Sequence, residues 1–148
     1  MELSTSIQEN QVQPTMSNTI PSGDYMIVNV GYPNRYVCMS ENKDFAGHDV
    51  GQTIKVDIKD ENQCLATFYD TATELYLGVD QTDAKVKGYT DPQVFQLYNA
   101  RDGSFEIRVP NGDKMWVLED GGDWTPITVQ ATAGSDGEYW RFVMGTPE

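Results

Sequence analysis

The fold of this chain is decided by residues 94–143, which read VFQLYNARDGSFEIRVPNGDKMWVLEDGGDWTPITVQATAGSDGEYWRFV. Four short apolar runs follow one another here, at 95–97, 105–109, 115–118 and 127–129. Gly, Asn or Asp separates each run from the next, and aromatic residues recur with period two in the closing segment, at Trp140 and Phe142. This pattern is typical of consecutive antiparallel strands joined by tight turns.

The same pattern extends toward the N-terminus in a less regular form. Further strands are expected at 25–30, 36–39, 53–58, 64–69, 75–79, 84–86 and 94–98, with a polar loop at 40–49. No window shows helical periodicity longer than a turn. The sequence therefore predicts an all-β protein.

A motif repeats three times, with a polar residue two positions before a large apolar one. The pairs are Gln63 with Leu65, Gln93 with Phe95, and Glu138 with Trp140. The apolar anchors are 30 and 45 residues apart, so the second of three units is expected to be short by about a third. Upstream strands carry the aromatic residues Tyr36, Tyr76 and Trp116, which are more often core or rim residues than ligand contacts. Three such units would close around one core with pseudo-threefold symmetry, and the anchors are expected to gather near its axis.

Composition limits the function classes. The chain has 148 residues, which fits one domain, and a net charge of −13. So acidic a surface repels phosphate backbones and anionic lipids, which argues against nucleic-acid and membrane-surface partners. No run of about 18 apolar residues is present, so no membrane insertion is expected.

Residues 1–20 are polar and lack both a basic segment and an apolar segment, so we expect a flexible tail ahead of a domain at 21–148. This predicts a cytoplasmic location, or release without a classical signal peptide. Cys38 and Cys64 do not make a disulfide framework. Free thiols in a reducing compartment are favoured, but the sequence alone does not decide between free thiols and a disulfide.

The sequence does not favour catalysis. It has a single histidine, His48, which is expected to be a solvated loop residue. There is no nucleophile elbow, no His/Cys set with zinc spacing and no phosphate-binding glycine loop. Neighbouring carboxylates are expected by chance among 23 acidic residues. The sequence therefore predicts no enzyme, no cofactor and no metal site.

The three Gln-x-Trp-like motifs, together with GDYMIVNV, RYVCMS and ELYLGVD ahead of them, resemble the ricin-B-type β-trefoil lectins, especially the small single-domain fungal ones. The resemblance covers about residues 21–143, and Asn62-Gln63-x-Leu65 is similar to the family's Asn-Gln-x-Trp. It implies a β-trefoil of three repeats with about four strands each, the second shortened. It also implies binding of galactose-type glycans or glycoproteins, with a defensive role. The sequence does not decide whether the protein is a monomer or a homodimer.

The resemblance further implies a sugar site in each unit, built from an Asp on the second strand, an Asn before the Gln and an aromatic ring. Here the Asp positions hold Cys38, Gly78 and Leu118, the Asn positions Asn62 and Pro92, and the aromatic positions Gln52 and Tyr89. The predicted carbohydrate-binding residues are Asn62, Tyr89, Asp91, Trp116, Asp123 and Trp124. Trp124 is the best single candidate, because it lies in the polar loop 120–126 and an exposed Trp is costly unless it is used.

A second function class is open. Mushroom β-trefoils that resemble this chain include inhibitors of serine and cysteine proteases, which present one surface loop to the enzyme. The loops 31–35, 40–49 and 134–137 are candidates. A trypsin-directed loop needs an exposed cation, and among these loops Arg35 and Lys43 qualify.

Overall fold

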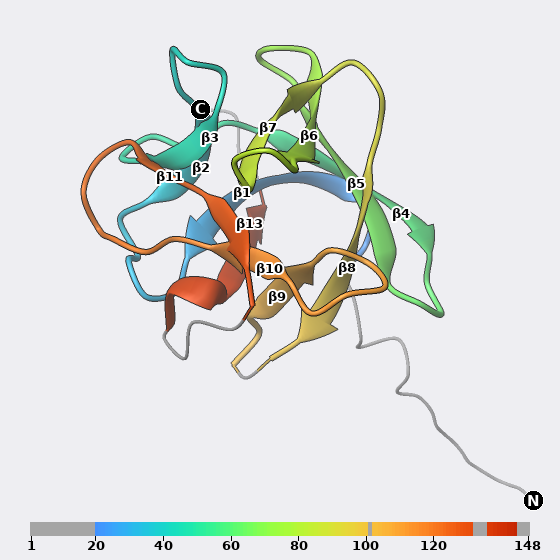
Figure 1. The fold of residues 1–148 in the computed structure, drawn as a ribbon. Coiled ribbons are helices and arrows are strands. Elements are labelled where there is room, and N and C mark those ends of the chain that lie inside the picture. Colours follow the sequence, from blue (N-terminus) through green and yellow to red (C-terminus); the bar gives the residue numbers. More distant parts are fainter. Residues whose placement is uncertain (1–19, 101, 132–135, 145–148) are drawn as a thin grey trace, which may run out of the picture.

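The computed structural model describes residues 20–100, 102–131 and 136–144, which form a 13-stranded sheet (Figure 1). The elements are β1 (Gly23–Asn29), β2 (Tyr36–Met39), β3 (Phe45–His48), β4 (Ile54–Asp60), β5 (Leu65–Asp70), β6 (Leu75–Asp80), β7 (Lys85–Tyr89), β8 (Val94–Asn99), β9 (Phe105–Arg108), β10 (Met115–Val117), β11 (Thr125–Pro126), β12 (Thr128–Gln130), the 3-10 helix η2 (Asp136–Glu138) and β13 (Trp140–Met144). The predicted tail at 1–20 lies, except for its last residue, outside the described residues. Within the described ranges no helix is long and apolar enough to cross a membrane.

Six strands close into a barrel. They pair antiparallel in the ring order β1, β4, β5, β8, β9, β13 and back to β1. The ring is completed by the first and last strands, where Tyr25 lies opposite Met144 and Asn29 opposite Trp140. A closed ring leaves the barrel without an unpaired edge. The all-β prediction is confirmed.

Three hairpins, β2–β3, β6–β7 and β10–β12, complete the fold. The first two lie side by side at the top of the view in Figure 1. Phe45, Val86 and Ile127 occupy equivalent positions 41 residues apart, and all three are fully buried. Their backbones meet, because the N–H of Val86 donates to the carbonyl of Ile127 at 3.0 Å and the N–H of Ile127 to that of Phe45 at 2.9 Å. Barrel, hairpins and pseudo-threefold repeat make this the β-trefoil that the resemblance implies.

Aromatic side chains fill the centre of the barrel. The ring of Trp116 lies 5.2 Å from that of Phe95, 5.3 Å from Phe68 and 6.2 Å from Trp140. The indole Nε1 of Trp140 also donates to the carbonyl of Trp116 at 3.1 Å. All four side chains are 0–1% exposed, and they belong to the same buried core as Ile27 and Ile54 of the first unit.

One of the three predicted anchors is wrong. Leu65 is only half-buried and begins β5, the first strand of the second unit. The true counterpart of Phe95 and Trp140 is Ile54, which is fully buried at the start of β4. The residues two positions before the anchors support this correction.

Gln52 and Gln93 make equivalent hydrogen bonds in the first and second units. The Oε1 atom of Gln52 accepts the N–H of Met39 at 2.9 Å, and that of Gln93 accepts the N–H of Val79 at 3.0 Å. Gln63, the polar residue of the first predicted motif, is instead exposed in the turn between β4 and β5. The motif therefore marks the entry into β4 and β8, the last barrel strand of each unit.

The corrected anchor also changes the unit lengths. From first to last strand the units span residues 23–60, 65–99 and 105–144, or 38, 35 and 40 residues. The second unit is the shortest, by a few residues and not by a third. The predicted polar loop 40–49 also contains a strand, β3, which pairs with β2 and buries Phe45 despite its weak local strand signal.

Asp70 is a fully buried carboxylate at the end of β5. Its oxygens accept the N–H of Ala72 at 3.2 Å and the hydroxyl of Thr73 at 2.8 Å. Loss of solvation raises the pKa of Asp70, and these hydrogen bonds only partly oppose the rise. The native state therefore holds this proton at pH values where the unfolded state has released it.

We expect Asp70 to make the free energy of unfolding fall as pH rises from the ordinary aspartate pKa, about 3.9, through the raised value. Above that window its contribution should stay constant. Asp70→Asn removes the titration, so its stability relative to wild type should rise across the same window. Urea denaturation of both proteins in steps from about pH 3 to about pH 7 measures this. Parallel pH profiles would contradict the expectation.

Candidate functional site

Trp124 is an exposed indole on a loop whose backbone is fixed. The loop docks on β3, where Thr125 lies opposite Gly47 and Pro126 opposite Ala46. The N–H of Trp124 donates to the carbonyl of Gly47 at 2.7 Å, and its φ is 66°, a left-handed conformation that costs energy for a bulky residue. The side chain is nevertheless 41% exposed. The fold thus holds a large aromatic ring at the surface at some conformational cost.

His48 supports that ring from one side. Its imidazole stacks on the indole of Trp124 with centroids 3.9 Å apart and planes at 15°. The Nδ1 atom of His48 lies 2.7 Å from Oδ1 of Asp123, which orients the imidazole. The prediction of a solvated loop histidine is wrong, since His48 is half-buried at the end of β3. Its stacking partner Trp124 is 76 residues away along the chain, so no local pattern could reveal the contact.

The other end of the loop is also anchored. The Nε atom of Arg35 donates to the carbonyl of Gly121 at 2.8 Å, and the same guanidinium pairs with Asp49. The ring of Tyr32 packs so closely on Gly121 that a Cβ there would lie 2.7 Å from it. The loop is thus held at both ends, and the positive charge of Arg35 is neutralised by Asp49.

A pocket of about 320 Å³ opens beside the indole. Its lining comes from the β2–β3 turn, β3, β11 and the loop before β11, and consists of Ser40, Glu41, Asn42, Asp44, Ala46, Trp124 and Pro126. We call this the Trp124 pocket. The carboxylate of Asp44 lies 3.8 Å from Nζ of Lys85 and 4.0 Å from Nζ of Lys87, so it is placed by charges on the neighbouring hairpin. An aromatic surface beside carboxylate, amide and hydroxyl groups can bind a sugar through its C–H face and its hydroxyls.

The predicted site residues do not form one site. Asp123 and Trp124 lie together, whereas Asn62 lines a different pocket with Tyr98. Tyr89 ends β7, and loss of solvation raises the pKa of its hydroxyl. Asp91 follows on the exposed surface. The structure thus brings together two of the six predicted residues.

The prediction for Trp116 is wrong, because this side chain is fully buried in the core and cannot contact a sugar. The strand register explains the error. Val117 lies opposite Thr128 on β12, as Gly78 lies opposite Lys87 on β7. Because Thr128 and Lys87 each follow the equivalent residues Ile127 and Val86, Val117 is equivalent to Gly78. Trp116 is therefore equivalent to the core residue Leu77 and not to Tyr76.

The same register relocates the sugar positions that the resemblance implies. The third Asp position holds the buried Val117 and not Leu118, and the first aromatic position holds His48 and not Gln52. At Gly78 an added Cβ would lie 2.3 Å from Nε2 of Gln93, so the amide occupies the space of an Asp. The first Asp position holds the buried thiol of Cys38, whose pKa is raised by loss of solvation. Both cysteines are free, as the sequence favours.

Sequence reasoning found Trp124 but missed the lining residues between Ser40 and Ala46, because they lie in a segment predicted as a loop for protease binding. Only the polar run Ser40–Asp44 next to a strand could have pointed to them. Within residues 20–100, 102–131 and 136–144, no cluster of His, Cys, Asp or Glu is suited to hold a metal ion.

Solved structures with the same fold include fungal lectins and an inhibitor. The ricin B-like lectin of Macrolepiota procera, in complex with lactose, has a TM-score of 0.75 and 19% identity, over 92% of this chain and 100% of that chain. The Rhizoctonia solani agglutinin has a TM-score of 0.71 and 17% identity, over 85% and 97%. A proteinase inhibitor from Coprinopsis cinerea has a TM-score of 0.68 and 14% identity, over 85% and 99%.

No family model and no curated protein matches the sequence. At these identities the likeness shows the fold alone. The chain has the β-trefoil fold of the ricin B-like lectins, a fold shared by lectins and by a protease inhibitor.

Proposed function

We propose that this protein is a carbohydrate-binding protein that holds a galactose-type sugar in the Trp124 pocket. The observation that carries the proposal is the exposed indole of Trp124, stacked on His48 and placed beside Asn42 and Asp44. Stacking on an aromatic ring selects the apolar face of a pyranose, and fixed polar groups distinguish the orientation of its hydroxyls. The likeness to a lectin solved with lactose supports the choice of sugar.

The expected partners of this binding site define its biological role. Glycans or glycoproteins of another organism would be the partners, which gives the protein a defensive role. The net charge of −13 supports partners other than nucleic acids and anionic membranes. The free thiols of Cys38 and Cys64 support residence in a reducing compartment.

Trp124→Ala should abolish most of the signal on a glycan array and weaken lactose binding at least about tenfold in calorimetry, because the stacking surface is lost. Tyr98→Ala is the matched control, since Tyr98 is 43% exposed and lines other pockets. That variant should bind as wild type does. Equal binding by wild type and Trp124→Ala would remove this pocket from the site.

Protease inhibition is the second candidate, and one observation favours a particular residue. Lys43 is exposed in the β2–β3 turn, whereas Arg35 is tied to Asp49 and Gly121. Of the two predicted cations, Lys43 is therefore the one free to enter a trypsin-type pocket. Lys43→Ala should relieve any inhibition of trypsin, and an inactive wild type against trypsin, papain and legumain-type proteases would rule this class out.

A further inference from the structure

The outer face of the barrel carries a second pocket, which shares no lining residue with the Trp124 pocket. On β4, Ile54 and Val56 are fully buried, while Lys55 and Lys59 are exposed and Asp57 is half-buried. This alternation follows from the two-residue period of a strand, which puts every second side chain outside the barrel. Three charged side chains therefore stand in a row on one face of β4.

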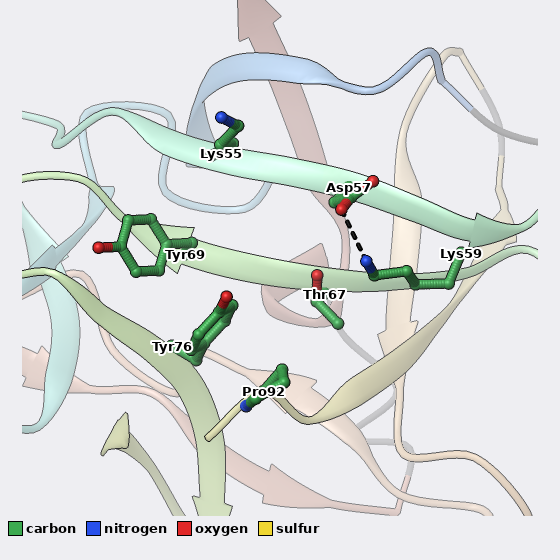
Figure 2. Close-up of a pocket in the computed structure, with 7 residues that line it drawn as sticks. All are labelled: Lys55, Asp57, Lys59, Thr67, Tyr69, Tyr76 and Pro92. Carbon is green, nitrogen blue, oxygen red and sulfur yellow. Dashed lines mark hydrogen bonds and ion pairs between the residues drawn. The ribbon is translucent and has the colours of Figure 1, made fainter. Parts of the chain in front are cut away.

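The strand register sets aromatic and hydroxyl groups beside these charges. Lys55 lies opposite Tyr69 on β5, which lies opposite Tyr76 on β6, and Asp57 lies opposite Thr67. The rings of Tyr69 and Tyr76 meet edge to face with centroids 4.9 Å apart. In Figure 2 the hydroxyls of Tyr76 and Thr67 point to the same side, toward Asp57 and Lys59. The pocket of about 280 Å³ is lined by Lys55, Asp57, Lys59, Thr67, Tyr69, Tyr76 and Pro92, and we call it the β4–β5–β6 pocket.

A bulge shapes its charged end. The register of β4 against β5 shifts between Ile58 and Asp60, so Lys59 is the extra residue on β4. Bulges re-aim side chains, and here Nζ of Lys59 points back to Oδ2 of Asp57 at 2.8 Å (Figure 2). Asp57 thus neutralises Lys59, whereas Lys55 forms no ion pair within the described residues, although the exposed Asp24 lies opposite it on β1.

The balance of charge in this pocket is the reverse of that of the chain. Two lysines and one aspartate give it a net charge of about +1, on a protein with a net charge of −13. A ligand with one negative group is therefore favoured here over the rest of the surface. The volume of about 280 Å³ is just below the usual range of small-molecule sites, which suits one sugar ring better than a chain of them.

We propose that the β4–β5–β6 pocket binds an acidic sugar residue, a pyranose that carries a carboxylate. Lys55 pairs with the carboxylate, and the tyrosine rings provide surface for the C–H face of the sugar. Thr67, Tyr76 and Asp57 hydrogen-bond its hydroxyls. The site is separate from the Trp124 pocket and shares no residue with it.

A titration of the full chain, followed by the backbone amide resonances in ¹H–¹⁵N spectra, tests this. D-glucuronate should shift the amide resonances of Lys55, Thr67, Tyr69 and Tyr76. D-glucose, which lacks the carboxylate, should bind about tenfold more weakly, and added salt should weaken glucuronate binding. Lys55→Gln should weaken glucuronate binding about tenfold, whereas the exposed Lys114→Gln should leave it unchanged.

Several results would overturn the proposal. Equal binding of glucose and glucuronate would show that the charge has no role, and inorganic sulfate binding as tightly as glucuronate would show an anion site without a sugar preference. Unchanged binding by Lys55→Gln, or no shifts at all, would also refute it. Trp124→Ala should keep glucuronate binding, so failure of the proposed function and failure of this inference are distinguishable. Glucuronate binding that depends on Trp124 would assign the ligand to the other pocket.

Discussion

Trp116→Ala should lower the free energy of unfolding by about 3–5 kcal/mol, as expected for a large aromatic side chain removed from a packed core. The rings of Phe68, Phe95 and Trp140 all lie within 6.2 Å of the Trp116 ring, so the cavity would open in the core between the second and third units. Since domains of this size are stable by about 5–15 kcal/mol, the loss is a large fraction of the total. Urea denaturation followed by circular dichroism measures it.

Two phenylalanine variants sharpen this test. Trp116 Nε1 is a buried polar atom without a hydrogen-bond partner within the described part of the chain, whereas Nε1 of Trp140 donates to the carbonyl of Trp116. Trp116→Phe removes an unpaired donor, and Trp140→Phe removes a paired one. The second variant should therefore be less stable than the first by about 1 kcal/mol. Trp124→Ala, at the surface, should cost about 1 kcal/mol or less. A Trp116→Ala protein as stable as Trp124→Ala would disprove the assignment of Trp116 to the core.

The second large effect is expected at Gly78. Gly78→Asp, which introduces the acidic residue that the resemblance implies, should destabilise the protein by about 2–4 kcal/mol and should create no galactose site. Its Cβ would lie 2.3 Å from Nε2 of Gln93 and 2.7 Å from Cδ2 of Tyr89. Displacing Gln93 would also leave the N–H of Val79 without its acceptor. Overpacking costs about 1–3 kcal/mol, and the loss of the acceptor of the partly buried N–H of Val79 costs about 1 kcal/mol more.

Gly112→Asp is the matched control, because the nearest atom to a Cβ there is the carbonyl oxygen of Val109 at 4.0 Å. Its stability should stay within about 0.5 kcal/mol of wild type. Thermal unfolding of the two variants, with lactose binding measured on each, separates the expectations. A stable Gly78→Asp protein with a gain in lactose affinity would mean that the second unit can be converted into a galactose site.

The all-β class and most strands could be predicted because alternating apolar residues and turn residues are local signals. The glutamine that marks the repeat in the first unit could not be predicted in this way. Gln52-Thr53-Ile54 and Gln63-Cys64-Leu65 have the same pattern, and the hydrogen bond from Met39 to Gln52 and the full burial of Ile54 distinguish them. That hydrogen bond depends on the hairpin geometry, which the local sequence does not contain.

The two tryptophans show the same limit at the level of the site. The glycines and aspartates around Trp124 correctly favoured exposure, whereas the apolar run 115–118 around Trp116 did not show which of its side chains is buried. Trp116 is buried because its strand register places it level with Leu77, which depends on pairing with β12. The β4–β5–β6 pocket was also beyond prediction, since Lys55, Tyr69 and Tyr76 become neighbours only through the register of three strands.

The pairing of β1 with β13 has a consequence for biosynthesis. The strand made first on the ribosome has a partner more than 110 residues later, so the barrel cannot close until that last strand has emerged. Such long-range contacts make folding slow, and the open side of β1 can meanwhile pair with other nascent chains. Deleting β13 would therefore leave a chain that aggregates instead of a smaller folded protein.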